Sequence, residues 1–529
     1  MSKKRILSIV LAGILIFGVL AACAPAAQPG PAPHVPHGTQ PGQPPAPEPE
    51  AALPLGRGLV VATQNEAPSI APARHSAVAG SFKNVLTHNG LFRQNYYDLE
   101  PVPDVVASWT AISDTLFEFT LYEGIMFHNG EEMTAYDVVA SVDYVRNYPY
   151  ARAAHGSIVS AYVVDRYTFR LDTGEPNAML FPDLTHQGNM VMPRSLIETG
   201  HDFTANPVGS GPFVFEDWRF GDSLTFVRFE DYFDRNRTAR IDYVHWRIIP
   251  EGSSRTIALE IGEVDYIVEV AFPDIPRMQD NPNITVFVQP GVTYNFLLLN
   301  NDLPMFSNVY VRRAIDMAID KEAAVLASVD GFGVPIWENV PTVFAGASSE
   351  GIRSFDPDGA RALLAEHGVD PADITFSMLA SNEEGRRRGE VVQANLADIG
   401  IHTTIEMTDL STYLNVTQFG DYEAGFGGFT SATLIGFLRG TSHINSIDAQ
   451  NRSRMYNREL SDLIDRAIAT IDTPARLAIL EEASRVANEH VGFIPMHLGM
   501  VIRAFNANLA APEISATGAL NFNMVYWAD

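Results

Sequence analysis

The 529-residue chain contains a single cysteine, Cys23. One thiol excludes an intrachain disulfide and a metal site built from several thiolates, so a large apolar core must hold the fold. The composition allows such a core, because 46% of the residues are hydrophobic and 19% are charged, as in ordinary globular proteins. The length exceeds what one compact core usually holds and predicts two to four domains.

Basic residues are scarce. The chain has 36 Lys and Arg against 63 Asp and Glu, which gives a formal net charge of -27 at pH 7. Nucleic acid phosphates and anionic lipid surfaces both attract the opposite sign of charge. The composition therefore excludes nucleic acid as a partner and excludes electrostatic docking to a membrane, and it favours solubility.

The local signatures of common catalytic sites are missing. The chain has no His-Glu-x-x-His, no Gly-x-Ser-x-Gly, no Walker loop and no dinucleotide fingerprint. Its 14 histidines are scattered, without a pair at helical metal-binding spacing beside a carboxylate. We therefore expect a protein that is not an enzyme and that holds no cofactor.

Long apolar runs are absent, with one exception at the N-terminus. Residues 6–20 are apolar, follow Lys3-Lys4-Arg5 and end in Leu20-Ala21-Ala22-Cys23. The run is shorter than the ~20 residues of a membrane span and predicts a secretory signal peptide over residues 1–22. Its end resembles the lipobox of bacterial lipoproteins, which implies acylation of Cys23 and anchoring outside the cell membrane. A signal peptide with a chance cysteine, or an uncleaved anchor, is the alternative.

A Pro- and Ala-rich segment follows, over residues 23–55. It has too little apolar surface to fold and predicts a disordered, semi-rigid tether between the membrane and the globular body.

The body, from residue 56 onward, is β-rich at first and helical later. Pro residues predict helix starts at Asp356-Pro357, Asp370-Pro371 and Thr473-Pro474. This order predicts an α/β protein with two lobes. The expected strands are residues 58–62, 117–121, 168–171, 223–227, 285–288 and 295–299, and the expected helices are residues 309–327, 359–366, 389–399, 459–471 and 474–490.

Four segments carry a longer pattern. They are residues 99–139, which contain Phe127-His128-Asn129-Gly130; Asn206-Pro207-Val208-Gly209-Ser210-Gly211-Pro212-Phe213; Gly262-Glu263-Val264-Asp265; and residues 311–321, with Val311-Arg312-Arg313-Ala314-Ile315 and Ala318-Ile319-Asp320-Lys321. Together, and in this order, they resemble the family 5 extracytoplasmic solute-binding proteins, the peptide- and nickel-binding class that serves ATP-binding-cassette (ABC) importers. The resemblance covers essentially the whole body.

The resemblance implies a two-lobe fold of the periplasmic-binding-protein type (type II, the large cluster with an extra subdomain in the first lobe). Lobe I is expected over residues 56–290 and lobe II over residues 291–496, and residues 497–529 return to lobe I. The crossovers are expected near Val288-Gln289-Pro290 and Pro495-Met496-His497. The lobes of such a protein close around a solute by a hinge motion.

The same motifs also have a purely structural interpretation. His128-Asn129-Gly130 predicts a tight turn, and Thr134 with Asp137 has capping-box spacing. Gly209-Ser210-Gly211-Pro212 lacks the Lys-Ser/Thr of a phosphate loop and predicts a structural turn. Arg312 and Arg313 are expected to pair with local carboxylates, and Arg386-Arg387-Arg388 to form a solvated helix start.

In peptide-binding relatives the ligand backbone adds as a strand to the cleft edge of lobe II. The corresponding stretch is Gly425-Phe426-Gly427-Gly428-Phe429-Thr430-Ser431-Ala432. Glycines let a second backbone approach closely, so Gly427, Gly428, Phe429, Thr430 and Ser431 are candidate ligand-binding residues; a simple Gly-rich turn is the alternative. The relatives continue with an Asp for the ligand's ammonium group, whereas Thr430, Ser431 and Thr433 stand here without an acid, which places free N-termini in doubt.

Other solutes stay open. His443 follows the Gly-rich stretch and is a weak candidate for a nickel-chelate ligand, although a lone loop His is more often incidental. An oligosaccharide would use the hydroxyl-rich strand with Trp337 or Tyr456 as stacking surfaces, and Asn65 is a candidate contact from lobe I.

The sequence thus predicts a monomeric, lipid-anchored, extracytoplasmic receptor that captures a small, peptide-like solute. Its partners would be the permease and ATPase subunits of an ABC importer. A chemosensory receptor that uses the same cleft is the alternative from another functional class.

Overall fold

The computed structural model describes residues 56–67, 69–72, 78–148, 157–204 and 206–528. The predicted signal peptide, Cys23 and the whole of the predicted tether lie outside the described residues. Within them, no helix has the length and apolar character needed to cross a membrane.

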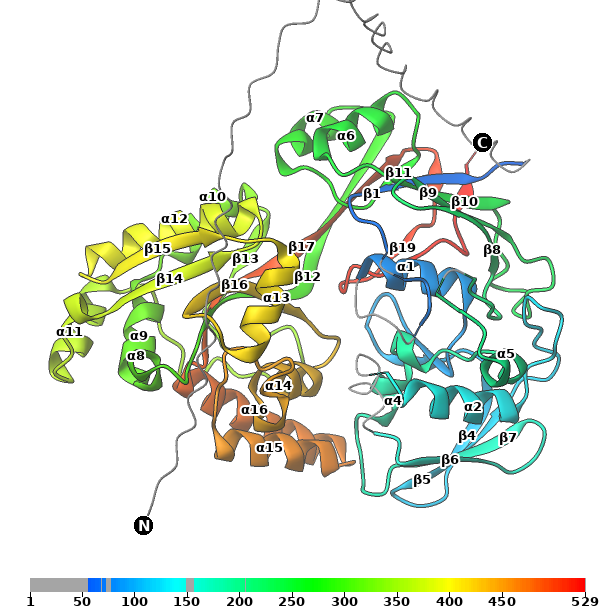
Figure 1. Cartoon of the computed structure of the whole chain (residues 1–529), viewed down its shortest axis with the longest axis horizontal. Helices are drawn as coiled ribbons and strands as arrows, with labels where there is room; N and C mark the ends of the chain where they lie inside the picture. The colour runs from blue at the N-terminus through cyan, green and yellow to red at the C-terminus, as the bar shows by residue number, and fades with distance from the viewer. Residues whose placement is uncertain (1–55, 68, 73–77, 149–156, 205, 529) are drawn as a thin grey trace, which may run out of the picture. The chain divides into compact units, whose positions relative to one another are not determined.

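One large mixed sheet organises the described chain, and its strands come from both halves of the sequence (Figure 1). The long neighbours β12 and β17 lie at its centre and continue from one half of the sheet into the other. In sheet order the strands are β15 (His402–Met407), β14 (Thr375–Ala380), β16 (Ala424–Thr430), β12 (Ile284–Leu299), β17 (Phe493–Asn506), β11 (Tyr266–Ile267), β1 (Leu59–Thr63), β10 (Tyr243–Ile248), β9 (Ser223–Arg228) and β8 (Phe213–Arg219), and β13 (Gly333–Pro335) also pairs with β17.

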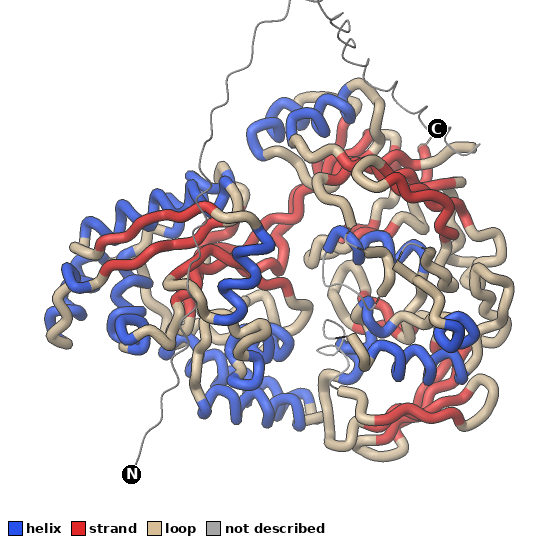
Figure 2. Tube along the Cα trace, in the orientation of Figure 1, coloured by secondary structure: helices blue, strands red, loops and turns tan. Residues whose placement is uncertain are grey.

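A second sheet lies apart from the first and has four antiparallel strands (Figure 2). Its strand β5 alternates buried and half-buried residues, the period-2 pattern of a sheet with one face on a core. The order is β4 (Val106–Ala111), β5 (Leu116–Leu121), β7 (Thr168–Asp172) and β6 (Ser160–Val163); the short pairs are β2 (Phe92–Gln94) with β3 (Pro101–Pro103), β18 (Leu509–Ala510) with β21 (Tyr526–Trp527), and β19 (Glu513–Ile514) with β20 (Leu520–Asn521).

Separate apolar cores support the two halves of the large sheet. One core gathers Leu59, Phe226 and Trp246 around β1, β9 and β10, and β1 is largely buried between parallel neighbours, as its unbroken apolar sequence requires. The other core packs helices on β12, β14 and β16. The helices are α1 (Val78–Thr87), α2 (Ala135–Val145), α4 (Leu180–Leu184), α5 (Arg194–Thr199), α6 (Gly252–Glu260), α7 (Ile275–Gln279), α8 (Pro304–Ser307), α9 (Val309–Ala318), α10 (Lys321–Val329), α11 (Pro357–Glu366), α12 (Glu383–Asp398), α13 (Leu410–Phe419), α14 (Leu434–Ser442), α15 (Arg458–Ala469) and α16 (Thr473–His490).

The predicted strands all occur, and residues 285–288 and 295–299 belong to the single strand β12. The helix expected over residues 309–327 is two helices, α9 and α10, because Ile319 takes an extended conformation and the Asp320 side chain accepts a hydrogen bond from Ala323 N. The cap of α16 is Asp472 and not Thr473, since the Asp472 carboxylate accepts from Ala475 N. Asp356 caps α11 as predicted, whereas Asp370 begins only a short 3-10 turn.

The two predicted turns form one piece of scaffold. Gly130 takes a φ of +84°, and His128 of the same turn donates its backbone N–H to Gly209 O, with its Nε2 3.0 Å from Gly211 O. A Cβ on Gly211 would lie 2.5 Å from Leu86 O at the end of α1. Glycine is therefore required there by close backbone approach, which gives this segment a structural role.

The arginines of the α9 motif differ from expectation. Arg312 is buried and donates to four backbone carbonyls, those of Phe306, Ser307, His490 and Val491, and Arg313 donates to Glu489 O. Carbonyls, and not carboxylates, satisfy these guanidinium groups, because α9 packs beside the C-terminal end of α16.

Candidate functional site

The Gly-rich stretch is a strand, β16, and one of its edges is only partly covered. On one side β16 pairs with β12 along its whole length, from Ala424 opposite Leu299 to Thr430 opposite Thr293. On the other side β14 pairs only with Ala424 and Gly425. From Phe426 to Thr430 this edge has no neighbouring strand within the described part of the chain.

The register shows which backbone groups point to the open edge. Asn300 N donates to Glu423 O at 3.0 Å, so these two residues form a hydrogen-bonded pair of the antiparallel ladder. Such pairs alternate, and Gly425, Gly427 and Phe429 therefore bond to β12. The N–H and C=O groups of Gly428 and Thr430 face the other way, and both residues are exposed.

Side chains flank both faces of this strand. A Cβ on Gly427 would lie 2.9 Å from Tyr413 Oη, and a Cβ on Gly428 would lie 3.1 Å from Asn295 Oδ1. The Thr430 and Thr293 hydroxyls are 2.9 Å apart across the ladder. A Cβ on Gly427 would also lie 3.3 Å from the Phe296 ring, so the glycines keep the backbone clear of both polar and apolar neighbours.

Two of the candidate side chains serve local structure. The Phe429 ring meets Phe437 edge-on, with ring centroids 6.0 Å apart, and packs on α14. The Ser431 hydroxyl donates to Thr433 O, and Thr433 Oγ1 accepts from Gly436 N at the start of α14. At this edge the exposed backbone, and not these side chains, is the available recognition group.

The remaining candidates lie on other elements. Asn65 is exposed after β1, which β12, β17 and β11 separate from β16 in the sheet. Trp337 is half-buried after β13, with its ring 5.9 Å from Lys321 Nζ, and Tyr456 is exposed and accepts a hydrogen bond from Arg458. Residues 427–431 lie together at the open edge. Within the described chain, no contact was found that joins Asn65, Trp337 or Tyr456 to them.

His443 is buried, and both of its ring nitrogens are engaged. Nε2 lies 3.1 Å from Asp465 Oδ1, and Nδ1 accepts from Asn445 N at 3.0 Å. Among the described residues, no three His, Cys, Asp or Glu side chains gather in a way that would hold a metal ion. This geometry gives His443 a structural role at the end of α14.

One side chain beside the open edge was not recognised from sequence. Arg388 of α12 is buried, and its guanidinium carbon lies 5.9 Å from the ring centroid of Phe426, the first β16 residue beyond β14. The expectation of a solvated helix start is wrong for this residue. Arg388 has helical spacing from the other buried residues of α12, which include Gly385, Val392 and Leu396. This spacing could have predicted its burial from the sequence.

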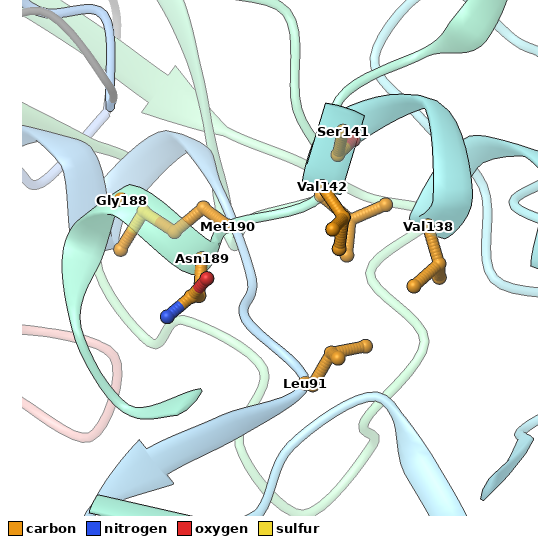
Figure 3. A pocket seen from close by; sticks show the side chains of 8 residues that line it. Leu91, Val138, Ser141, Val142, Gly188, Asn189 and Met190 are labelled. Carbon is orange, nitrogen blue, oxygen red and sulfur yellow. The ribbon is translucent and has the colours of Figure 1, made fainter. Parts of the chain in front are cut away.

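A small hollow beside α2 is a different feature (Figure 3). Leu91, Val138 and Val142 line it, and the Ser141 hydroxyl is hydrogen-bonded to Asp137 O and accepts from Met192 N. It contains no titratable side chain, and we assign no function to it.

Comparisons with known proteins agree with this geometry. Residues 100–434 match the family model described as bacterial extracellular solute-binding proteins, family 5 Middle. Heme-binding protein A of Haemophilus influenzae is 26% identical over 77% of this chain and 80% of its own length. Glutathione-binding protein GsiB of Salmonella paratyphi A is 25% identical over 84% and 89%.

Among solved structures, the ABC transporter-associated periplasmic binding protein DppA from Helicobacter pylori, in complex with the peptide STSA, superposes with a TM-score of 0.81. It is 24% identical and covers 90% of this chain and 99% of its own. The predicted two-lobe fold is confirmed. The chain belongs to the bacterial extracellular solute-binding proteins of family 5, whose members bind solutes and carry out no catalysis.

Proposed function

We propose that this chain is the lipid-anchored receptor of an ABC importer and captures a peptide-like solute between lobe I (residues 56–290, with residues 497–529) and lobe II (residues 291–496). Acylated Cys23 would hold it, as a monomer, at the outer face of the cell membrane. From there it would deliver solute to the permease and ATPase subunits. The partly uncovered edge of β16 is the observation that carries the proposal.

An extended amide backbone is the chemistry that fits this edge. Gly428 and Thr430 present N–H and C=O groups that no described strand pairs, in the repeat of a sheet ladder. A solute with the same repeat would add to them as a further strand. Main-chain hydrogen bonds of this kind recognise a peptide-like backbone without regard to its side chains. The peptide in the Helicobacter structure and the glutathione in the name of the Salmonella relative support a solute of this class.

Residues 430–433, at and just after the end of β16, contain no carboxylate for an ammonium group. Thr430 at the end of β16, and Ser431 and Thr433 after it, are uncharged, and a buried ammonium without a carboxylate would be costly. The proposed solute is therefore held by its backbone and not by a free N-terminus.

Replacement of Thr430 by Pro tests the role of the backbone. The N–H of residue 430 faces the open edge and does not bond to β12. Proline therefore removes a donor from the open edge without breaking a hydrogen bond between β16 and β12. We expect Thr430→Pro to reduce loading with peptides from a casein digest by about tenfold, measured by native mass spectrometry, with little change in melting temperature. Thr430→Val, which keeps the N–H and loses only the hydroxyl, should load normally. Normal loading of Thr430→Pro would reject the strand-addition model.

The anchor is tested separately by the mass of the N-terminal peptide of purified protein. That peptide should begin at Cys23 and carry acyl groups, and an unmodified N-terminus would reject the anchor.

A further inference from the structure

Arg388 occupies an unusual position for an arginine. It lies on the sheet-facing side of α12, the helix that follows β14, and is only 4% exposed. Side chains of a helix lean toward its N-terminus, which here is the end joined to the carboxyl end of β14. Its guanidinium lies against Phe426, where β16 continues beyond β14. The charge therefore lies beside the open edge proposed to hold the solute.

The Arg388 guanidinium lacks acceptors among the described residues, where neither a hydrogen bond nor an ion pair is found for it, and its Nε is fully buried. The other three buried arginines among the described residues do have acceptors. Arg255, Arg312 and Arg503 each donate to backbone carbonyls. Two residues earlier on α12, Arg386 pairs with Glu383 and Glu390. A buried charge without acceptors is costly, and such a group in a native protein calls for an explanation.

The surroundings of Arg388 are short of negative charge. The carboxylate that acts on it most is Glu384, one helical turn earlier, and burial raises the pKa of Glu384. The other titratable groups that interact with it are Tyr413, whose hydroxyl is buried without a partner among the described residues, and His497 of β17. Burial lowers the pKa of Arg388 to about 10, so the guanidinium stays charged at neutral pH.

We propose that Arg388 binds a carboxylate of the solute that lies along β16. A guanidinium presents parallel N–H donors that match the two oxygens of a carboxylate, and the bound anion would supply the acceptors that the protein omits. The Tyr413 hydroxyl, next to Gly427, is a second free donor. The inference rests on the proposed function and narrows the solute to peptide-like molecules that carry an anionic group. A site that binds an N-terminal ammonium would instead need a negatively charged side chain.

A pair of probes that differ only in carboxyl charge tests the inference. The full chain is mixed with a tryptic digest of casein or with the same digest after methyl esterification, and bound peptide is measured by native mass spectrometry. We expect the wild type to load the free acids about tenfold or more above the esters. Arg388→Met should load the two digests equally. Arg386→Met, which changes the same residue type on the same helix, should keep the wild-type preference.

Stability separates a binding role from a structural one. Without solute, Arg388→Met should melt at the wild-type temperature or above, because it removes a buried charge without acceptors. If this variant does not fold, Arg388→Gln gives the same readout with a polar side chain of similar reach.

Each outcome is decisive. Equal loading of both digests by wild type, a preference that survives in the Arg388 variant, or a clear loss of melting temperature in both Arg388→Met and Arg388→Gln would overturn the role of Arg388 alone. Failure of wild type to load either digest would instead reject the peptide-like solute, and this inference with it.

Discussion

At the scale of single residues, burial determines the charge state of several histidines. His88 is 2% exposed, with Nδ1 2.8 Å from Thr87 Oγ1, and desolvation lowers its pKa to about 3. Burial likewise lowers the pKa of His497 to about 3 and those of His128 and His490 to about 4. These four side chains are neutral in the folded protein at pH values where an unfolded chain would protonate them.

The consequence is a loss of stability in acid. Between pH 6.5 and 4 the unfolded chain binds more protons at these positions, so the free energy of unfolding falls as the pH falls. Each histidine contributes a slope of about 1.4 kcal/mol per pH unit in that window. We expect the free energy of unfolding of His88→Asn to fall with decreasing pH less steeply than that of the wild type, by about 1.4 kcal/mol per pH unit. Urea unfolding between pH 7 and 4 measures this difference. A variant with the wild-type slope would show that His88 does not titrate on unfolding.

At the scale of elements, capping residues do more than begin helices. Asp137 in the first turn of α2 accepts from Thr134 N at 2.8 Å and from Thr134 Oγ1 at 2.7 Å, as the capping-box spacing predicted. The same carboxylate accepts from Arg194 N at 2.8 Å, at the start of α5. One side chain thus joins the starts of two helices that are far apart in sequence.

This double role predicts unequal costs. Thr134→Ala should lower the free energy of unfolding by about 1 kcal/mol, the ordinary cost of a lost cap. Asp137→Ala leaves two buried or half-buried N–H groups without an acceptor and should cost about 2–3 kcal/mol. Chemical denaturation of the two variants, with Thr134→Ser as the control that keeps a hydroxyl, measures the difference. Equal costs would mean that the link to α5 contributes nothing.

At the scale of the whole molecule, α4 and the segment before it contact α14 and α15 away from the central strands. Arg439 of α14 donates to Asp183 of α4 at 3.2 and 3.4 Å, and Ala178 N donates to Ile468 O of α15. Met179 of the same segment packs with Tyr294 and Phe437. α4 falls in the proposed lobe I and α14 in the proposed lobe II, and Asp183 is 6% and Arg439 29% exposed. We therefore expect this ion pair to stabilise a closed arrangement of the two proposed lobes.

Loss of the ion pair should therefore favour opening. A partly buried pair of this kind is worth about 1 kcal/mol. Arg439→Met should therefore weaken binding of the proposed peptide-like solute about fivefold and raise the radius of gyration of the solute-free protein in X-ray scattering. Arg485→Met, whose ion pairs with Glu482 and Glu489 lie within α16, is the matched control. Wild-type affinity and scattering in the Arg439 variant would contradict a closing role.

Much of the local structure follows from sequence, and the exceptions share a cause. The strands, the capping box and the Asn-Gly turn depend on neighbours within a few residues, and all of them occur as predicted. The break between α9 and α10 was missed, since continuous apolar periodicity hides an internal cap at Asp320. Arg312 was assigned the wrong partners because its carbonyl acceptors include two from the end of α16, almost 180 residues away.

The candidate site likewise has some features that the sequence predicts and others that depend on packing. The glycines of β16 and the lack of an acid after it are visible in the sequence, but the open edge exists only because β14 pairs with two residues and then ends. The burial of Arg388 depends on how α12 packs over Phe426.

The family, the α/β class and the positions of most elements follow from the amino-acid sequence, because propensity, capping and apolar periodicity act over short distances. The open edge of β16, the burial of Arg388 and the contact between α4 and α14 come instead from tertiary packing. Those properties depend on contacts between segments that lie from tens to hundreds of residues apart in sequence, and no local pattern encodes such contacts.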